Sequence, residues 1–365
     1  MQSQLPSWEP AARSMLARAM EQNRLLGWLT PTNLARELEA LCADWRRGNE
    51  RLPRWRYPAA PASAALCRRL GELADELEPR EPLGPWYAGR ARELALELEL
   101  GTTADPQRFV ELGRRRFTRR DGFDDQADGL SDRWLAASRP EPRRATIRSD
   151  DGTDPRSLLC CMRAEVERQE LPIQVTPTQE LSALAAIGPG AIYVIAGRRL
   201  SEADVSRTVL HEIHGHALPQ LRGQRARLGI FQVGTAHGAD DQEGRAIGLE
   251  EEAQLLDGGR RLELALRHAA ARAVEAGASF VETARVLGEH PVSLFDRLRI
   301  TARAHRGGGL GRERVYLPAY LRVRAARAAD PAVDEVLASG SVAVGAVAAL
   351  RRWRGDHLSG HGRPR

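Results

Sequence analysis

SEADVSRTVLHEIHGHALP, residues 201–219, places three histidines and one glutamate within six consecutive positions. Ser201 is a favourable N-cap residue, and Asp204 supplies the acidic partner of a capping box at the positive end of a helix. Apolar residues recur at helical spacing through the stretch. The pattern predicts one capped helix that packs on a core, turns its histidines into a cleft, and ends or kinks at Pro219.

His211 and His216 are five residues apart, whereas the His-Glu-x-x-His pattern of many zinc proteases has two histidines four apart on one helix face. On a regular α-helix the longer spacing separates the two side chains by roughly 140°. An inserted residue in a π-bulge would bring them to one face, and Gly215 is the expected place for that distortion. The alternative pair, His211 with His214, needs no bulge but leaves His216 without a role.

A catalytic zinc site needs a third protein ligand and leaves its fourth position open. Residues 240–251 read DDQEGRAIGLEE and predict a second helix that begins after the acidic pair at its start. On spacing alone, the third ligand can be any of four glutamates within or directly after this segment, namely Glu243, Glu250, Glu251 and Glu252.

The two segments resemble the motifs of a bacterial family that is named for a Gln-Glu-Gly-Leu-Ala sequence and linked to flavohemoglobin expression. They are also similar to those of its animal relatives, the microtubule-associated tubulin tyrosine carboxypeptidases. The matching stretches are residues 211–216, read as His-Glu-x-x-x-His, and residues 242–246. Weaker similarity covers residues 304–307 and 315–317, and residues 53–57 resemble a further signature that ends in tyrosine.

This resemblance implies that His211, His216 and Glu243 bind one Zn²⁺ and that Glu212 is the general base. The residue order agrees, because Glu212 directly follows the first ligand and can take a proton from water at the metal. Zinc lowers the pKa of such water to about 7 and polarises the scissile carbonyl, so hydrolysis needs no covalent intermediate.

Two residues depart from the family pattern. His214 stands where the family has a small residue, and Arg245 replaces the leucine of the named motif. His214 is a candidate for a spare ligand, a proton donor or a residue that supports the ligands, and Gln242 is a second candidate for such support. Arg245 either contacts substrate or faces solvent.

The segment after residue 304 is expected to contact substrate. Arg306 precedes a glycine-rich run, and its guanidinium can pair bidentately with a substrate C-terminal carboxylate, the contact that a carboxypeptidase needs. Tyr316 can donate a hydrogen bond to an oxyanion. The alternative for each residue is structural, a salt bridge for Arg306 and a packed ring for Tyr316.

Composition narrows the possible partners. The chain has a net charge of +5, and all 54 of its Lys and Arg positions are arginine, which excludes Schiff-base and P-loop lysine chemistry. These arginines are interspersed with Asp and Glu in helical stretches, so nucleic acid is not expected as a partner. The four cysteines lack the spacing of a zinc ribbon, and no apolar segment predicts a signal or a membrane span. We therefore expect a cytoplasmic protein with no membrane partner.

The overall pattern predicts an α+β fold that is mostly helical. Residues 1–117 are expected to form a helical N-terminal region, and residues 118–157 a polar, loop-rich connection. Residues 158–350 are expected to form a gluzincin-like zinc metallopeptidase domain with a small sheet beside the zinc helix. Residues 351–365 are expected to be a basic, disordered tail.

Two strands and a short helix are expected before the zinc helix. Residues 171–176 alternate in polarity, and residues 191–196 are rich in β-branched side chains, so both are predicted strands. The apolar residues 181–187 between them are predicted to be helical.

The sequence thus predicts a zinc-dependent metallocarboxypeptidase that removes a residue from the C-terminus of a peptide or protein. The alternative is a non-catalytic regulatory protein with a structural zinc site, in which His214 would serve as the fourth ligand. Glu212 favours the enzyme, since a structural zinc has no need of a general base.

Overall fold

The computed structural model describes residues 5–59, 63–119, 121–137, 146–179, 181, 183–188 and 190–354. Its N-terminal part is helical, as predicted. The helices are α1 (Glu9–Gln22), α2 (Leu25–Leu29), α3 (Leu34–Arg46), α4 (Ala64–Leu77), α5 (Gly84–Thr102) and α6 (Pro106–Phe117).

The connection expected to be loop-rich, residues 118–157, instead contains helix α7 (Phe123–Ala137). Ala127 and Leu130 are buried, and Trp134 packs against the same cluster, so apolar side chains recur every three or four residues. This face packs on α13 and α16. Asp124 and Asp125 lie in the first turn of α7, where acidic residues stabilise a helix, and residues 138–145 of the connection lie outside the described residues.

A three-stranded sheet has the order β2, β4, β3, in which β2 (Gln174–Thr178) is parallel and β3 (Ala185–Gly188) antiparallel to β4 (Ala191–Ile195). β4 confirms one predicted strand. The helix predicted over residues 181–187 is wrong, because residues 185–188 pair with β4. Pairing with β4 overrides the helical preference of the alanines. A second ladder joins β1 (Ile147–Arg148) to β5 (Arg199–Leu200).

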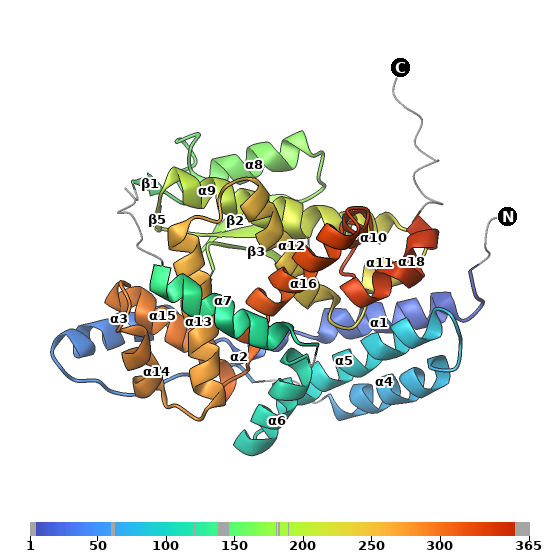
Figure 1. Cartoon of the computed structure of the whole chain (residues 1–365), viewed down its shortest axis with the longest axis horizontal. Coiled ribbons are helices and arrows are strands. Elements are labelled where there is room, and N and C mark those ends of the chain that lie inside the picture. The colour runs from blue at the N-terminus through green and yellow to red at the C-terminus, as the bar shows by residue number, and fades with distance from the viewer. Residues whose placement is uncertain are drawn as a thin grey trace.

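The remaining chain is largely helical and surrounds α12. In Figure 1, α8, α9 and the strands gather on one side of α12, and α1, α4 and α5 lie on the other. α12 packs on η1 and α16, and the edge strand β3 also contacts η1. These elements are α8 (Leu158–Arg168), α9 (Glu202–Val209), η1 (Leu210–Ala217), α10 (Leu218–Arg225), α11 (Ile230–Val233), α12 (Gly238–Glu252), α13 (Gly258–Glu275), α14 (Phe280–Leu287), α15 (Leu294–Ala304), η2 (Arg306–Gly308), η3 (Arg312–Arg314), α16 (Tyr316–Ala329), α17 (Val333–Leu337), η4 (Val344–Ala346) and α18 (Val347–Arg354).

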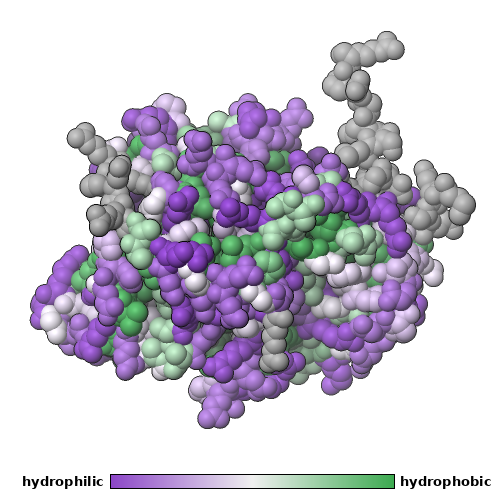
Figure 2. Space-filling model, in the orientation of Figure 1, coloured by the Kyte–Doolittle hydropathy of each residue, from purple (hydrophilic) through white to green (hydrophobic). Residues whose placement is uncertain are grey.

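The start of the expected tail is also helical, since α18 extends to Arg354, and the rest of that tail lies outside the described residues. The face shown in Figure 2 is mainly hydrophilic, with smaller apolar areas between the polar side chains. Among the described residues, no helix combines the length and apolar character that a membrane crossing requires. Cys42, Cys67, Cys160 and Cys161 are all free thiols.

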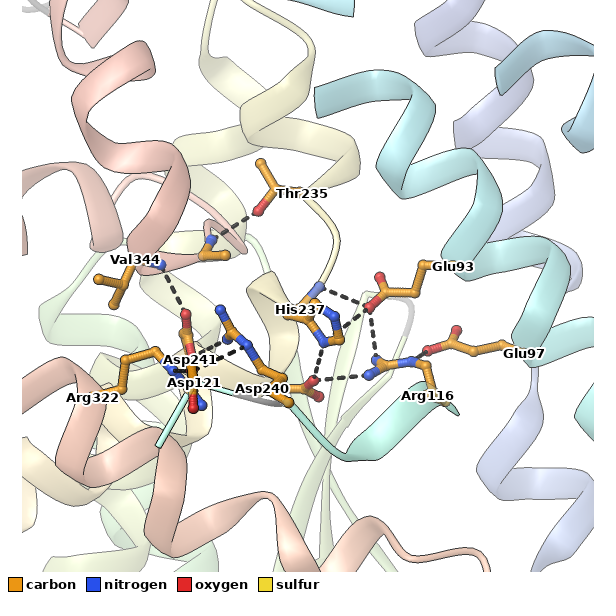
Figure 3. Close-up of polar contacts among 12 residues, drawn as sticks. Glu93, Glu97, Arg116, Asp121, Thr235, His237, Asp240, Asp241, Arg322 and Val344 are labelled. Carbon is orange, nitrogen blue, oxygen red and sulfur yellow. Dashed lines mark hydrogen bonds and ion pairs between the residues drawn. The ribbon is translucent and has the colours of Figure 1, made fainter. Parts of the chain in front are cut away.

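Buried ion pairs fix the N-terminal end of α12 (Figure 3). Arg116 of α6, whose side chain is 4% exposed, lies 2.8 Å from Asp240 and 2.6 Å from Glu97 of α5. Arg322 of α16 lies 2.6 Å from Asp241. Both aspartates belong to the first turn of α12, which begins earlier than predicted. The network therefore ties the helix that carries Glu243 to three others.

Burial lowers the pKa of two histidines outside this region. His268 on α13 is fully buried, its Nε2 lies 2.7 Å from the Asp128 carboxylate, and its Nδ1 has no hydrogen-bond partner among the described residues. His305, at the end of α15, contacts the Thr283 hydroxyl at 2.9 Å. The pKa of each falls from 6.5 to about 4. Both are therefore neutral in the folded protein near neutral pH.

Stability is expected to decrease as the pH falls from 6.5 toward 4. In that interval the unfolded chain takes up a proton at His268 and at His305, whereas the folded chain does not. The free energy of unfolding then falls by up to about 1.4 kcal/mol per pH unit for each group. Urea unfolding at several pH values measures this slope. His268→Gln should reduce it and His290→Gln should not, and equal slopes in all three proteins would contradict the assignment.

Candidate metal centre

The capped helix predicted from residue 201 is present, with a π-helical second part. The Asp204 N–H donates to Ser201 Oγ at 3.1 Å, and the Ser201 N–H donates to the Asp204 carboxylate at 3.3 Å, which completes the capping box at the start of α9. η1 follows as eight residues of π-helix. Residues five apart share one face of a π-helix. The predicted distortion is therefore confirmed, and it extends over more residues than a bulge at Gly215.

The helix does not end at Pro219, because α10 continues to Arg225. Pro219 is the second residue of α10, and the helix type changes from π to α one residue before it. Because proline has no N–H, the preceding turn lacks one main-chain donor at this position.

His211, His216 and Glu243 converge from η1 and α12. The two Nε2 atoms lie 3.3 Å apart, and Glu243 Oε2 lies 3.4 Å from the first and 3.7 Å from the second. Ligand atoms 2.0–2.1 Å from a tetrahedral zinc ion are separated by roughly 3.4 Å. The three side chains are 12%, 18% and 13% exposed, respectively. Donor types, spacing and partial burial thus fit one zinc ion.

Close packing brings η1 against α12. A Cβ atom added at Gly215 would lie 2.6 Å from the Cβ of Ala246, and one added at Gly244 would lie 2.3 Å from the backbone of Ala319 on α16. Glycine at both positions allows the three helices to approach closely, and this approach brings Glu243 to the two histidines.

Gly215→Ala is expected to weaken zinc affinity by about tenfold or more, because the added methyl group forces η1 away from Ala246 and separates Glu243 from the histidines. Competition with a chromophoric chelator measures the affinity. Gly71→Ala is the matched control, since Gly71 lies inside α4 with open space around its Cα. Equal zinc affinity in both variants would show that this contact does not position the ligands.

Glu250 orients the first histidine. Its Oε1 accepts a hydrogen bond of 2.7 Å from His211 Nδ1, which turns Nε2 of the ring toward Glu243 and His216. Glu250 is fully buried and is held by Arg260 through contacts of 2.9 Å and 3.0 Å. A carboxylate behind a ligating histidine fixes the ring orientation and raises its basicity.

Electrostatics at the cluster follow from burial and close charge pairs. Burial by itself would raise the pKa of Glu243, but His216 and His211 outweigh it and hold the pKa well below the usual range. Burial would lower the pKa of His211, but Glu243 and Glu250 raise it to about 10. Arg260 and His211 likewise outweigh burial and lower the pKa of Glu250 to about 2. The carboxylates and His211 thus stabilise one another's charged forms.

Glu212 differs from these carboxylates. Burial raises its pKa above the usual value, and the charges of His211 and His216 oppose the shift only in part. Glu212 directly follows His211 in η1. A carboxyl group whose pKa is raised holds a proton more readily than an ordinary glutamate does, which suits a general base.

The other residues predicted to meet substrate are buried. Arg306 is 6% exposed, and burial lowers its pKa to about 10. Tyr316 is also 6% exposed, and the guanidinium of Arg267 stacks 3.8 Å from its ring centroid. The Gly307 N–H donates to the hydroxyl of Tyr57 at 3.3 Å. The segment after residue 304 therefore packs against residues 53–57, the signature that ends in tyrosine.

The two candidates for support of the ligands make their hydrogen bonds elsewhere. His214 Nε2 donates to Glu165 of α8 at 2.6 Å. Gln242 Oε1 accepts a hydrogen bond of 3.3 Å from the hydroxyl of Ser341. In this arrangement both side chains form hydrogen bonds to other segments, and neither contacts the converging residues through these bonds.

The sequence reasoning missed Arg312 and Arg260. Arg312 Nη2 lies 3.1 Å from Glu243 Oε1, and its side chain is 26% exposed. It follows the glycine run and has no motif of its own, so only the fold brings it to the cluster. Glu250 was one of the four glutamates considered as the third metal ligand. It follows Glu243 by seven residues, or about two helical turns, so both side chains lie on one side of α12.

A second group, formed by Glu93, His237 and Asp240, also has ligand atoms close enough for one ion. Arg116 already lies 3.3 Å from Glu93 and 2.8 Å from Asp240. Figure 3 shows its guanidinium directed at these carboxylates. A buried arginine thus supplies the positive charge here, which leaves the His211 cluster as the better metal candidate.

Comparison with known proteins supports the carboxypeptidase resemblance. A protein from Colwellia psychrerythraea described as a lipoprotein is 12% identical, with a TM-score of 0.47 over 97% of this chain and 78% of that chain. This likeness does not establish a shared fold. No curated protein matches the sequence. The family model of the microtubule-associated tyrosine carboxypeptidase, in contrast, matches residues 45–359, most of the chain and all three converging residues. The chain therefore belongs to the microtubule-associated tyrosine carboxypeptidase family.

Proposed function

We propose that this protein is a zinc-dependent metallocarboxypeptidase that removes a residue from the C-terminus of a peptide or protein. The observation that carries the proposal is the convergence of three ligand atoms separated by 3.3–3.7 Å. Glu212 directly follows the first of these residues in a chain that belongs to a carboxypeptidase family.

His211, His216 and Glu243 would hold the ion. When bound, Zn²⁺ polarises the scissile carbonyl and acidifies a water molecule. Glu212 accepts the proton of the attacking water and returns it to the leaving amine. Its raised pKa suits both steps, because the group must gain and lose one proton in each turnover.

Arg312 is the group to which we assign recognition of the substrate carboxylate. It is more exposed than Arg306 and lies beside Glu243, so a C-terminus that reaches the metal would meet its guanidinium. A pairing of this kind explains exopeptidase action, since a peptide bond far from the terminus offers no such anion. Arg306 and Tyr316 are each only 6% exposed, so we assign neither of them direct contact with the substrate.

The contact of His214 argues against the alternative of a structural zinc site. A closed structural site takes four protein ligands, and His214 is the residue that would complete it. Its Nε2 instead donates to Glu165 on α8. Three ligands and an accessible position are typical of catalytic zinc.

The test combines metal analysis with a product assay. The purified full chain should contain one zinc, and Glu243→Gln should lose or weaken it, whereas Glu251→Gln, a change at an exposed neighbour on the same helix, should keep it. Incubation with a mixture of peptides should release single C-terminal amino acids. Zinc without release would favour the regulatory alternative, and a chain without zinc would contradict the proposed site.

A further inference from the structure

Arg245 of α12 reaches the π-helical segment that carries the two histidines. Its Nη1 donates a hydrogen bond of 3.0 Å to the main-chain carbonyl of His214. The arginine side chain is only 7% exposed. Asp334 of α17 holds the other side of the guanidinium through contacts of 3.0 Å to Nε and 3.3 Å to Nη2. The donor is therefore oriented toward η1.

The His214 carbonyl is the acceptor that distinguishes two helical registers. In an α-helical register it would accept the N–H of Leu218, four residues later. In η1 that N–H donates instead to Ile213, five residues earlier. The π-helical partner of the His214 carbonyl would be residue 219, a proline, which has no N–H. The helix itself thus provides no donor for this carbonyl in the π register, and Arg245 provides one.

We propose that Arg245 is a positioning residue that holds η1 in the π register and thereby keeps His211 and His216 on one face. Its charge-assisted hydrogen bond occupies the acceptor that the α register requires. Without this bond, the Leu218 N–H can return to the His214 carbonyl. The α register would then turn His216 away from His211. The functional part of this inference rests on the proposed metal site, because its consequence is zinc affinity.

The experiment compares wild type, Arg245→Met, Pro219→Ala and the double variant of the full chain. Zinc affinity is measured by competition with a chromophoric chelator, and stability by the urea midpoint. Arg245→Met should weaken zinc affinity by about tenfold. Pro219→Ala provides an N–H for the His214 carbonyl in the π register, so in this background the loss of Arg245 should cost much less. The double variant should therefore bind zinc more tightly than Arg245→Met.

Arg327→Met is the control for a merely structural role. Arg327 of α16 also pairs with Asp334, at 3.6 Å. Its loss should lower the urea midpoint without weakening zinc affinity. Equal zinc loss in Arg327→Met and Arg245→Met, or no recovery in the double variant, would overturn the inference.

The two proposals can fail separately. If wild type binds no zinc, the proposed metal site is wrong, and the urea midpoints of the same four proteins decide the role of Arg245. If the urea midpoint of the double variant falls by less than the sum of the decreases in Arg245→Met and Pro219→Ala, the contact with the His214 carbonyl is supported. Strictly additive losses would overturn it.

Discussion

Glu212→Gln is expected to abolish release of C-terminal residues while the protein keeps its zinc. The amide cannot accept the proton of the attacking water or return one to the leaving amine, and loss of a general base costs about 10²–10⁴-fold in rate. The change is nearly isosteric, and Glu212 is not among the three converging ligand residues. Product release from a peptide mixture and the zinc content of the same preparation measure the two effects.

Glu202→Gln is the matched control, because Glu202 is an exposed glutamate on the same helical stretch. It should retain both activity and zinc. If Glu212→Gln kept the wild-type rate, another group would have to be the base. If the variant lost zinc together with activity, Glu212 would instead support the ligands.

Glu250→Gln is expected to weaken zinc affinity by about 10–100-fold and to destabilise the fold. The amide cannot orient His211 as a carboxylate does, and residues behind metal ligands have effects of this size. Arg260, 7% exposed, would lose its pairing with Glu250 and keep its contact with Glu263 at 2.9 Å. Breaking a buried ion pair lowers the free energy of unfolding by about 3–5 kcal/mol. Because Arg260 keeps its contact with Glu263, we expect a loss near the lower end of this range.

Chelator competition and urea unfolding of the metal-free protein separate the two consequences of Glu250→Gln. Glu251→Gln is again the matched control, since that residue is 37% exposed and lies 3.9 Å from Arg324. It should change the free energy of unfolding by less than about 1 kcal/mol. Unchanged zinc affinity in Glu250→Gln would show that the contact with His211 does not orient the ligand.

Local patterns predicted the centre of the candidate site. The capping box of Ser201 and Asp204 depends on hydrogen bonds that span three residues, so the start of the helix could be read directly. The spacing of His211 and His216 requires an irregular helix if both are to face one ion, and η1 is that helix. The choice of Glu243 came from the motif resemblance, because spacing left several glutamates open.

Contacts between distant segments decided the secondary structure of two further segments and the partners of the charged side chains around the candidate site. Residues 185–188 became a strand only because β4 pairs with them, and α7 is stable because α13 and α16 cover its apolar face. Arg312 reaches Glu243 across 69 residues of sequence, and Asp334 reaches Arg245 across 89.

The sequence by itself thus predicted the two helices that carry the candidate ligands and the need for an irregular register in the first, because helix caps and histidine spacing involve residues only a few positions apart. The tertiary structure alone decided the roles of Arg245 and Glu250, which contact the main chain of His214 and the ring of His211. Those roles depend on burial and charge pairing between segments whose approach no local pattern specifies.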